Sequence, residues 1–438
     1  MVAAGPSTPS ALLPAIVALA EEAGRVIEAG RAAGPIAAEA KADGSPVTKP
    51  DRESHAVIAA GLASLTPGVP VVSEEGRIAP QAERAGWTRF WLVDPLDGTK
   101  EFVAGRPEYT VNIALLEDGV PVLGVVHVPR DGTTYAAAAG AGSWRYRPGQ
   151  PAARLFASPP PAGAGLRVAE SRSHGSPELD DLLAAYTVRE RITIGSSLKF
   201  CLVAEGTADC YIRLGPTMEW DVAAGDAVFR WAVPDGAPPH ASPLVYNKPD
   251  LRNGAFTIGF LPPPPSVVWL TGLSGSGKST IAAPLVEALR ARGARVEWLD
   301  GDAIREVFPS TGFTRPDRDA HIRRVGYLAS RLEAHGVTVV ATLVSPYRDS
   351  RQFVRGLCTR FVEVHVATPF SECERRDPKG LYRKARAGQI ANFTGLDDPY
   401  EAPEAPEVTI DTTALSPEAA AARILAHLER QPAAASRP

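Results

Sequence analysis

The chain has 438 residues, more than one hydrophobic core usually supports, so two domains are expected. Its apolar content of 45% is ordinary for a globular protein. Its net charge of −4 argues against nucleic acid or an anionic membrane surface as a partner. Any anionic substrate must therefore be held locally by arginine, lysine, metal ions or backbone amides.

The cysteines and the N-terminal residues bear on the compartment. Cys201, Cys210, Cys358 and Cys373 show no metal-ligand spacing and are too few for a disulfide framework. We expect them to be reduced thiols of a cytoplasmic protein. Residues 1–20 lack the basic start of a signal peptide, and no apolar stretch approaches the length that spans a membrane.

The first part of the chain mixes helices with short strands. Its apolar spacing predicts two helices and then four strands, at 12–29, 51–65, 69–73, 90–93, 110–116 and 122–128. The last two strands are separated by Glu117-Asp-Gly-Val-Pro121, which is typical of a β-hairpin. Helical and strand segments then alternate to about Leu261.

Four prolines, Pro262 to Pro265, predict a stiff and extended linker. Beyond it, strands alternate regularly with helices, which predicts a mostly parallel sheet flanked by helices; these strands are expected at 267–271, 295–299, 337–344 and 361–366. The sequence therefore predicts a mixed α/β and α+β protein with a domain at 1–261, a linker at 262–265, a second domain at 266–431 and a disordered tail at 432–438.

A phosphate-binding loop opens the second domain. Gly272-Leu-Ser-Gly-Ser-Gly-Lys-Ser279 matches G-x-x-x-x-G-K-[ST], with an apolar strand before it and an amphipathic helix at 281–292. Glycines let backbone N–H groups approach phosphates, and the helix N-terminus adds a favourable dipole. Lys278 should reach the terminal phosphates and Ser279 should hold magnesium. The residues expected to bind ATP are Gly272, Leu273, Ser274, Gly275, Ser276, Gly277, Lys278, Ser279 and Thr280.

Acidic residues recur at the ends of predicted strands in the first domain. Asp94 and Asp97 lie three residues apart on one turn, Glu74 ends an earlier strand, and Asp221 lies further along the chain. Hard oxygen ligands from several segments, without histidine or cysteine, are typical of a magnesium site.

At these residues, over roughly 12–260, the chain resembles the inositol monophosphatase superfamily. The shared motifs, in family order, are Asp43 to Asp51, Val71 to Glu75, Asp94 to Thr99 and Trp220-Asp221. The resemblance implies a layered αβαβα fold and magnesium ligands at Glu74, Asp94, Leu96 (through its carbonyl), Asp97 and Asp221. It also implies that water attacking a phosphate ester, activated by magnesium, is positioned by Asp51, Glu74 and Thr99.

Three stretches, Ser171 to His174, Gly195 to Phe200 and Tyr211 to Arg213, resemble the 3′(2′),5′-bisphosphate nucleotidase branch of that superfamily. This implies hydrolysis of the 3′-phosphate of adenosine 3′,5′-bisphosphate (PAP) to AMP. A bis-anion needs cationic donors, and the resemblance places the second phosphate on Ser173, His174, Ser197 and Lys199, with Arg213 as a further residue that binds the nucleotide. The alternative is a phosphatase of inositol phosphate or of a sugar bisphosphate.

Motifs from about Val267 to Thr412 look like adenylyl-sulfate kinase, which uses ATP to phosphorylate the 3′-hydroxyl of adenosine 5′-phosphosulfate (APS), giving PAPS. They include Asp300-Gly-Asp302, Val344 to Arg348 and Arg376 to Tyr382. The resemblance implies that APS is bound by Arg305, Phe313, Arg318, His321, Val344, Ser345, Lys379 and Phe393. Asp302 would orient the attacking hydroxyl or a magnesium-bound water, and Lys278 would assist transfer, which relies mainly on positioning and charge neutralisation.

Two positions depart from the kinase family, since Ala303 and His321 stand where its members have asparagine. His321 can replace an amide donor, whereas Ala303 cannot, so an alternative is that one half only binds nucleotide. The main prediction is a bifunctional enzyme of sulfate activation that needs magnesium in both domains and ATP as co-substrate. Its partners would be ATP, APS, PAPS and PAP, and the resemblance implies a homodimer through the kinase domain.

Overall fold

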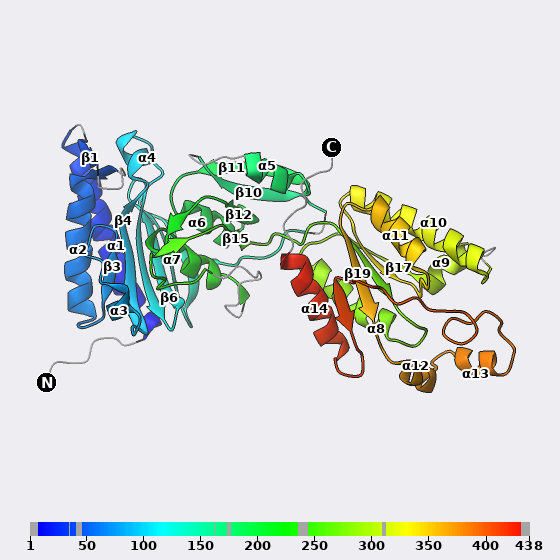
Figure 1. The fold of residues 1–438 in the computed structure, drawn as a ribbon. Helices are drawn as coiled ribbons and strands as arrows, with labels where there is room; N and C mark the ends of the chain where they lie inside the picture. The colour runs from blue at the N-terminus through cyan, green and yellow to red at the C-terminus, as the bar shows by residue number, and fades with distance from the viewer. Residues whose placement is uncertain are drawn as a thin grey trace. The chain divides into compact units, whose positions relative to one another are not determined.

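The computed structural model describes residues 8–34, 36–40, 46–161, 163–172, 177–234, 244–308 and 312–430. The chain divides into two compact units (Figure 1). The first unit takes Met1–Pro160, Leu166–Leu179 and Val188–Leu261, and the second takes Pro161–Gly165, Asp180–Thr187 and Pro262–Pro438.

The first unit is built on a seven-stranded sheet with the strand order β3-β4-β5-β6-β7-β8-β9. β3 is parallel to β4, and the other neighbouring pairs are antiparallel. Asp118 and Gly119 have positive φ angles of 48° and 76°, as the predicted tight hairpin between β5 and β6 requires. The strands are β3 (Val71–Ser73), β4 (Arg89–Asp97), β5 (Thr110–Glu117), β6 (Val120–Val128), β7 (Thr133–Ala138), β8 (Gly142–Tyr146) and β9 (Ala153–Leu155).

Both faces of this sheet are buried, because side chains alternate between them along each strand. In β4, Trp91 and Val93 pack against α1 (Pro9–Ala32) and α2 (Lys49–Leu65). Phe90 and Leu92 join the core on the other face, with α6 (Leu198–Ala204) and α7 (Glu219–Arg230). The sheet therefore lies between two layers of helices, as Figure 1 shows.

A second sheet of the first unit, in the order β11-β10-β12-β15, packs against α6. Phe200 of α6 contacts the rings of Tyr211 and Phe256 from this sheet. The alternation of helix layers and sheets confirms the predicted fold class. The strands are β10 (Leu166–Ser171), β11 (Val188–Ile194), β12 (Cys210–Arg213) and β15 (Phe256–Gly259), and α5 (Pro177–Leu183) joins β10 to β11.

Short elements complete the first unit. Two small antiparallel pairs, β1 with β2 and β13 with β14, lie outside the main sheets. The bounds of these elements are β1 (Ala38–Ala40), β2 (Pro46–Thr48), α3 (Gln81–Arg84), α4 (Thr99–Val103), β13 (Thr217–Met218) and β14 (Arg252–Asn253).

The second unit contains a five-stranded parallel sheet in the order β17-β18-β16-β19-β20. Its central strand sends Val268 and Leu270 into a core with α8 and α14, and Val267 and Trp269 into a core with α10 and α11. Helices thus cover both faces, as predicted. The strands are β16 (Val267–Thr271), β17 (Val296–Asp300), β18 (Thr338–Thr342), β19 (Phe361–Val366) and β20 (Val408–Ile410).

The helices of the second unit follow its strands in alternation (Figure 1). They are α8 (Lys278–Ala291), α9 (Gly301–Val307), α10 (Arg315–Ala334), α11 (Arg348–Leu357), α12 (Phe370–Arg376), α13 (Leu381–Arg386) and α14 (Pro417–Arg430). The predicted tail at 432–438 lies outside the described residues. Among the residues that are described, no helix has the length and apolar character needed to cross a membrane.

Candidate active sites

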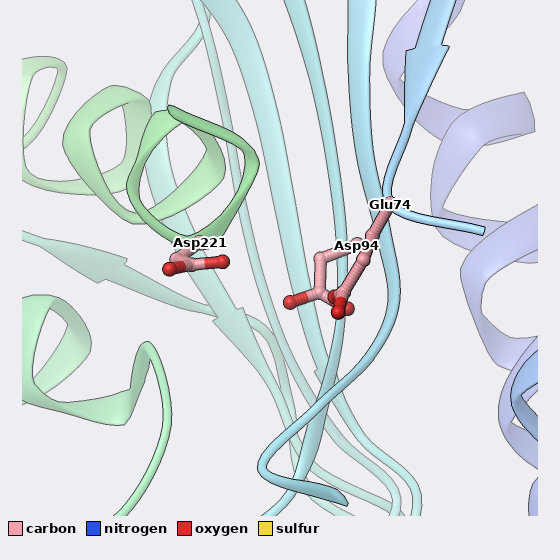
Figure 2. Close-up of side chains that lie close together, drawn as sticks. All are labelled: Glu74, Asp94 and Asp221. Atoms are coloured by element: carbon pink, nitrogen blue, oxygen red, sulfur yellow. The ribbon is translucent and has the colours of Figure 1, made fainter. Parts of the chain in front are cut away.

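A cluster of carboxylates lies where β3, β4 and α7 of the first unit meet. The N–H of Glu74 donates to the carbonyl of Val93 at 3.1 Å, which places Glu74 beside Asp94. Asp94 alternates with Val93 and therefore faces the side of the sheet that carries α7. Asp221 lies in the first turn of α7. Oxygens of Glu74, Asp94 and Asp221 lie within 4.8 Å of one another, and Figure 2 shows the three side chains.

The carboxylates of this cluster repel one another. Burial raises the pKa of Asp94 well above its usual range, and Glu74, Asp97 and Asp221 raise it further. Burial also raises the pKa of Asp221, with Asp97 adding to the effect. Both shifts make the ionised form of these aspartates less favourable in the metal-free protein. Clustered hard oxygen donors whose repulsion a cation would remove fit a divalent ion such as Mg²⁺.

Asp97 lies beside the cluster but is fixed by different partners. Its Oδ2 accepts from the backbone N–H of Ser197 at 2.6 Å and from Nδ2 of Asn112 at 3.3 Å. Burial raises the pKa of Asp97 to about 6, although Lys199 and these hydrogen bonds oppose the rise. Asn112, which pairs with Asp94 in the sheet, is a supporting residue that the sequence motifs did not reveal.

Asp51 and Thr99 form a hydrogen-bonded pair at the entrance to α4. The Thr99 hydroxyl lies 3.2 Å from Oδ1 of Asp51 and 3.1 Å from the carbonyl of Leu96. Asp51 is also bonded to the N–H of Thr48 at 2.9 Å. Burial raises the pKa of Asp51, and nearby Glu74 adds to the rise. Asp51, Glu74 and Thr99, which the family resemblance linked to the attacking water, therefore lie close together in the structure.

The turn between Asp97 and Thr99 depends on Gly98. Its φ of 90° lies in the left-handed region, and a Cβ there would come within 2.9 Å of the carbonyl of Glu108. Glycine is therefore required at position 98 for the turn that brings the Thr99 hydroxyl next to the carbonyl of Leu96.

The residues predicted to hold a second phosphate have different surroundings. Ser173 and His174 lie outside the described residues. The Ser197 hydroxyl is 2.8 Å from Oδ1 of Asn112. Ser197 therefore bonds to Asn112 through its side chain and to Asp97 through its backbone N–H. Arg213 donates to the carbonyls of Gly215 and Pro216, both at 3.1 Å. Their predicted contacts with a phosphate stay a prediction.

Lys199 is buried at the start of α6 and faces the carboxylate site. Its Nζ donates to the carbonyls of Ile194 and Ser196 and lies 5.3 Å from the centre of the Tyr211 ring. Burial lowers the pKa of Lys199 to about 8, although Asp97 raises it. Ser196 has a left-handed φ of 51°, so Lys199 holds a strained turn between β11 and α6.

In the second unit, the phosphate loop joins β16 to α8 as the motif predicts. Gly272, Gly275 and Gly277 all have positive φ, and a Cβ on Gly272 would lie 2.6 Å from the carbonyl of Val366. Lys278 begins α8, and its Nζ donates to the carbonyls of Gly272 and Leu273 at 2.9 and 2.8 Å. Burial lowers the pKa of Lys278 to about 8.

The far end of the phosphate loop is held by threonines from neighbouring strands. The carbonyl of Ser276 accepts from Oγ1 of Thr368 at 2.9 Å and from Oγ1 of Thr412 at 3.1 Å. These threonines follow β19 and β20, and Arg376 of α12 donates to Thr412 at 2.8 Å. The loop is therefore bonded to the sheet as well as to its own helix.

Asp300 belongs to one of the kinase motifs in the sequence, but no role was predicted for it. It ends β17, and its Oδ2 accepts from the hydroxyls of Ser279 at 2.9 Å and Thr342 at 2.8 Å. Burial alone would raise the pKa of Asp300, but these hydrogen bonds and one from the N–H of Asp302 lower it overall. An acid at the carboxyl end of a parallel strand was the available signal, because such ends meet at one edge of the sheet.

Asp302, the predicted acid, lies in the first turn of α9 and is 69% exposed. It forms an ion pair with Lys379, which precedes α13. Asp302, predicted to orient the acceptor hydroxyl, and Lys379, predicted to bind APS, are thus in contact with each other.

Two arginines flank an exposed aromatic ring beyond α9. Phe313 is 55% exposed, with the guanidinium of Arg305 4.8 Å from its ring centre and that of Arg318 at 5.9 Å. Arg318 also bonds to Thr394 and to the carbonyl of Asn392. Two guanidinium groups beside an exposed ring suit an anionic nucleotide.

His321 and Phe393, both predicted to bind APS, are buried. His321 is 1% exposed, and neither ring nitrogen has a hydrogen-bond partner among the described residues. Burial lowers the pKa of His321 to about 4, with Arg305 and Arg324 adding to the effect, so the ring is neutral at pH 7. Phe393 packs edge-on to Tyr382 with ring centres 4.9 Å apart.

Comparisons with known proteins divide along the two units. The model of the inositol monophosphatase family matches residues 9–232, and that of adenylylsulphate kinase matches residues 264–411. The chain is 45% identical over 219 residues to the 3′(2′),5′-bisphosphate nucleotidase CysQ of Escherichia coli O157:H7, covering 50% of this chain and 86% of that protein. It is 53% identical over 146 residues to the adenylyl-sulfate kinase of Synechococcus sp. (strain JA-2-3B'a(2-13)), covering 33% of this chain and 83% of that protein.

A solved structure gives a similar result for the first unit. The crystal structure of CysQ from Bacteroides thetaiotaomicron, a bacterial member of the inositol monophosphatase family, is 39% identical with a TM-score of 0.46 and covers 56% of this chain and 96% of its own. Through residues 9–232 the chain belongs to the inositol monophosphatase family, and through residues 264–411 it belongs to the adenylylsulphate kinase family.

Proposed function

We propose that the chain is a bifunctional enzyme of sulfate activation. Its second unit transfers the γ-phosphoryl group of ATP to the 3′-hydroxyl of APS and gives PAPS. Its first unit hydrolyses the 3′-phosphate of PAP, which remains after PAPS donates its sulfo group, and gives AMP. The observation that carries this proposal is the presence of both sites, a buried carboxylate cluster in one unit and an intact phosphate loop bonded to Asp300 in the other.

In the first unit, the metal would be held by Glu74, Asp94, Asp97, Asp221 and the carbonyl of Leu96. Mg²⁺ bound there supplies positive charge that favours deprotonation of water and neutralises the leaving oxygen. The Thr99 hydroxyl lies within hydrogen-bond distance of both Asp51 and the carbonyl of Leu96; when a metal holds that carbonyl, Thr99 would donate to Asp51 and its oxygen would accept a hydrogen bond from the attacking water. As the water oxygen forms its bond to phosphorus, the bond from phosphorus to the 3′-oxygen breaks; Asp51 would receive the water proton through Thr99, and the departing 3′-oxygen would take a proton from solvent.

Substrate choice in the first unit depends on cations around the carboxylate site. Lys199 lies in α6 and Arg213 in β12, and Lys199 is close enough to oppose the charge of Asp97. With Ser173 and His174, they would bind the 5′-phosphate that PAP has and inositol monophosphate lacks.

In the second unit, the backbone of Gly272 to Gly277 and the ammonium of Lys278 would bind the phosphates of ATP. Ser279 and Asp300 would hold magnesium, since their hydroxyl and carboxylate already meet at 2.9 Å. The cationic group of Arg305 and Arg318 would neutralise APS, with adenine stacked on Phe313.

Transfer itself needs position more than a strong base. Asp302 would orient the 3′-hydroxyl of APS and accept its proton, while Lys379 leaves Asp302 for the transferred phosphoryl group. The bond from the γ-phosphorus to the bridging oxygen of ATP breaks, and a bond to the 3′-oxygen forms. Ala303 contributes no amide here, so we expect neighbouring residues to supply the positioning.

Further properties belong to the same proposal. The domains are those predicted, at 1–261 and 266–431, joined by the linker at 262–265. The protein is cytoplasmic, which its four free and buried cysteines support. It forms a homodimer through the kinase domain, which is supported by exposed apolar side chains of α10 and α11, namely Tyr327, Leu328, Phe353 and Leu357.

The test is a timed nucleotide chromatogram of the purified chain with ATP, Mg²⁺ and APS, to which PAP is added late. We expect PAPS to accumulate and persist while PAP is converted to AMP. A phosphatase that accepted PAPS would undo the kinase, so ADP would build up without PAPS. Release of phosphate from inositol monophosphate, but not from PAP, would overturn the nucleotidase assignment; absence of both ADP and PAPS would overturn the kinase assignment.

A further inference from the structure

Ser345, in the loop after β18, has an unfavourable backbone conformation. Its φ of 38° lies in the left-handed region, which residues with a Cβ adopt only where their surroundings hold them. The residue is buried, and its hydroxyl oxygen accepts from Nε1 of Trp269 at 3.0 Å. The bond from Trp269 fixes only the side chain of Ser345. The carbonyl of Ser345 needs a partner of its own to keep the next peptide group in place.

Arg351 of α11 holds that carbonyl. Its guanidinium donates to the carbonyl oxygen of Ser345 at 2.6 Å, to the carbonyl of Glu401 at 2.7 Å and to Oε1 of Glu363 at 2.6 Å. Arg351 is 2% exposed, so these bonds form away from competing water. One side chain therefore joins the loop after β18, strand β19 and the segment around Glu401.

The joined segments contain or contact residues predicted to bind APS. The loop at 343–347 follows the carboxyl end of β18, which pairs with β16, the strand that enters the phosphate loop. The N–H of Glu401 donates to the carbonyl of Pro346 at 2.8 Å, and Tyr347 bonds to Asp398 at 2.8 Å. The segment before Asp398 contains Thr394, the partner of Arg318.

The structure assigns Arg351 as a positioning residue for the acceptor side of the kinase site. It fixes the peptide after Ser345 and the segment around Glu401 against each other, so that Val344, Ser345 and the partners of Arg318 keep the arrangement that receives APS. This assignment rests on the proposed kinase activity of the second unit. Among the described residues, its guanidinium bonds to Glu363, Ser345 and Glu401 and not to the phosphate loop, so the effect should fall on APS and spare ATP.

Arg355 provides a matched control on the same helix. It also pairs with Glu363, at 3.3 Å, but its other bonds go to Glu407 rather than to Ser345 or Glu401. The experiment compares the full chain with its Arg351→Lys and Arg355→Lys variants. Lysine keeps the charge in both, but its compact ammonium cannot span partners that surround the planar fork of a guanidinium.

We expect Arg351→Lys to raise the KM for APS about tenfold or more and to leave the KM for ATP within about twofold, since small displacements of positioning groups have large effects. Arg355→Lys should change both constants by less than about twofold. Equal changes in the two variants, or an equal rise in the KM for ATP, would show that Arg351 only supports the fold.

Hydrogen exchange gives a readout that does not require turnover. Amides 344–347 and 399–401 should exchange faster in Arg351→Lys than in Arg355→Lys, with the phosphate loop unchanged. If Arg351→Lys does not fold, Glu363→Gln weakens the anchor of Arg351 and should raise the KM for APS in the same direction; an unchanged KM would overturn the assignment. If the wild-type chain makes no PAPS, the proposed function fails; equal exchange of these amides in the two variants would instead show that Arg351 does not fix the two segments.

Discussion

The two candidate sites bury charge of opposite sign. In the first unit, burial and mutual repulsion raise the pKa of Asp94 and Asp221. In the second unit, burial lowers the pKa of Lys278 to about 8. Each shift favours the uncharged form, so each site is electrostatically unfavourable until a ligand of opposite charge binds. The carboxylate cluster of the first unit therefore suits a cation, and Lys278 of the second unit suits an anion.

The largest expected effect is the selective loss of one of the two activities when a residue of its site is replaced. Asp94→Asn should lower PAP hydrolysis at least about 1,000-fold, because it removes a metal ligand on which charge stabilisation depends. It should leave PAPS synthesis unchanged. Lys278→Ala should have the opposite pattern, with a similar loss of PAPS synthesis. Single-substrate assays of both variants check this, and loss of both activities in either variant would contradict two independent sites.

A smaller loss is expected at Asp300. Asp300→Asn should lower PAPS synthesis about 100-fold and raise the Mg²⁺ concentration needed for half-maximal rate, because Ser279 loses its carboxylate partner. Thr342→Val removes the other hydroxyl bonded to Asp300 and serves as the control, with a loss of about tenfold or less. A normal Mg²⁺ requirement in Asp300→Asn would show that Asp300 only caps α9.

The pKa of Lys278 predicts how ATP binding depends on pH. Below about pH 8 the lysine is charged in the free protein and affinity should be flat. Above pH 8 it loses its proton, so the Kd of a non-hydrolysable ATP analogue should rise by up to about tenfold per pH unit. Lys278→Arg should bind more weakly at pH 7 but show no such rise, because arginine stays protonated. Calorimetric titrations from pH 7 to 10 measure both.

The smallest effect concerns the stability of the first unit without metal. Asp94→Asn should raise its unfolding temperature in chelator by about 2–4 °C, equivalent to about 1 kcal/mol, because a repelling group is removed. Raised carboxyl pKa values also mean that the folded state takes up protons first, so wild-type stability in chelator should increase as the pH falls from 7 toward 6, near the pKa of Asp97. Asp131→Asn, which lies on the turn between β6 and β7, is the control.

The effect of Mg²⁺ on stability tests whether the ion binds at the carboxylate cluster. Mg²⁺ should raise the unfolding temperature of the wild-type first unit and have little effect on Asp94→Asn. If Mg²⁺ stabilised both equally, the carboxylate cluster would not be where the ion binds.

Local motifs allowed the sequence to predict much of this structure. The phosphate loop is contiguous, so its strand, its glycines and Lys278 follow from one stretch of chain. The helix expected at 281–292 begins earlier, at Lys278, because Gly277 already turns the chain into the helix. The hairpin at Asp118 and Gly119 was equally local.

Other features depend on contacts between distant segments and could not be read from motifs. The partnership of Asp300 with Ser279 and Thr342 requires the order of β16, β17 and β18. Ser197 was expected to bind phosphate, but its fixing of Asp97 appears only once β4 and α6 are placed. The family resemblance predicted that Asp94 and Asp221 bind the same metal. The structure shows that the end of β4 and the first turn of α7 bring these two residues together, although they are far apart in the sequence.

The two threonine bonds to Ser276 bear on how nucleotide affinity arises. Thr368 and Thr412 follow separate strands, so the carbonyl of Ser276 is fixed when the sheet forms. Most of the conformational entropy of this part of the loop is therefore lost during folding, and little remains to be lost when ATP arrives. A chain that lacked these two hydroxyls could contact the same phosphates and still bind them less tightly, because ordering the loop would then oppose each binding event.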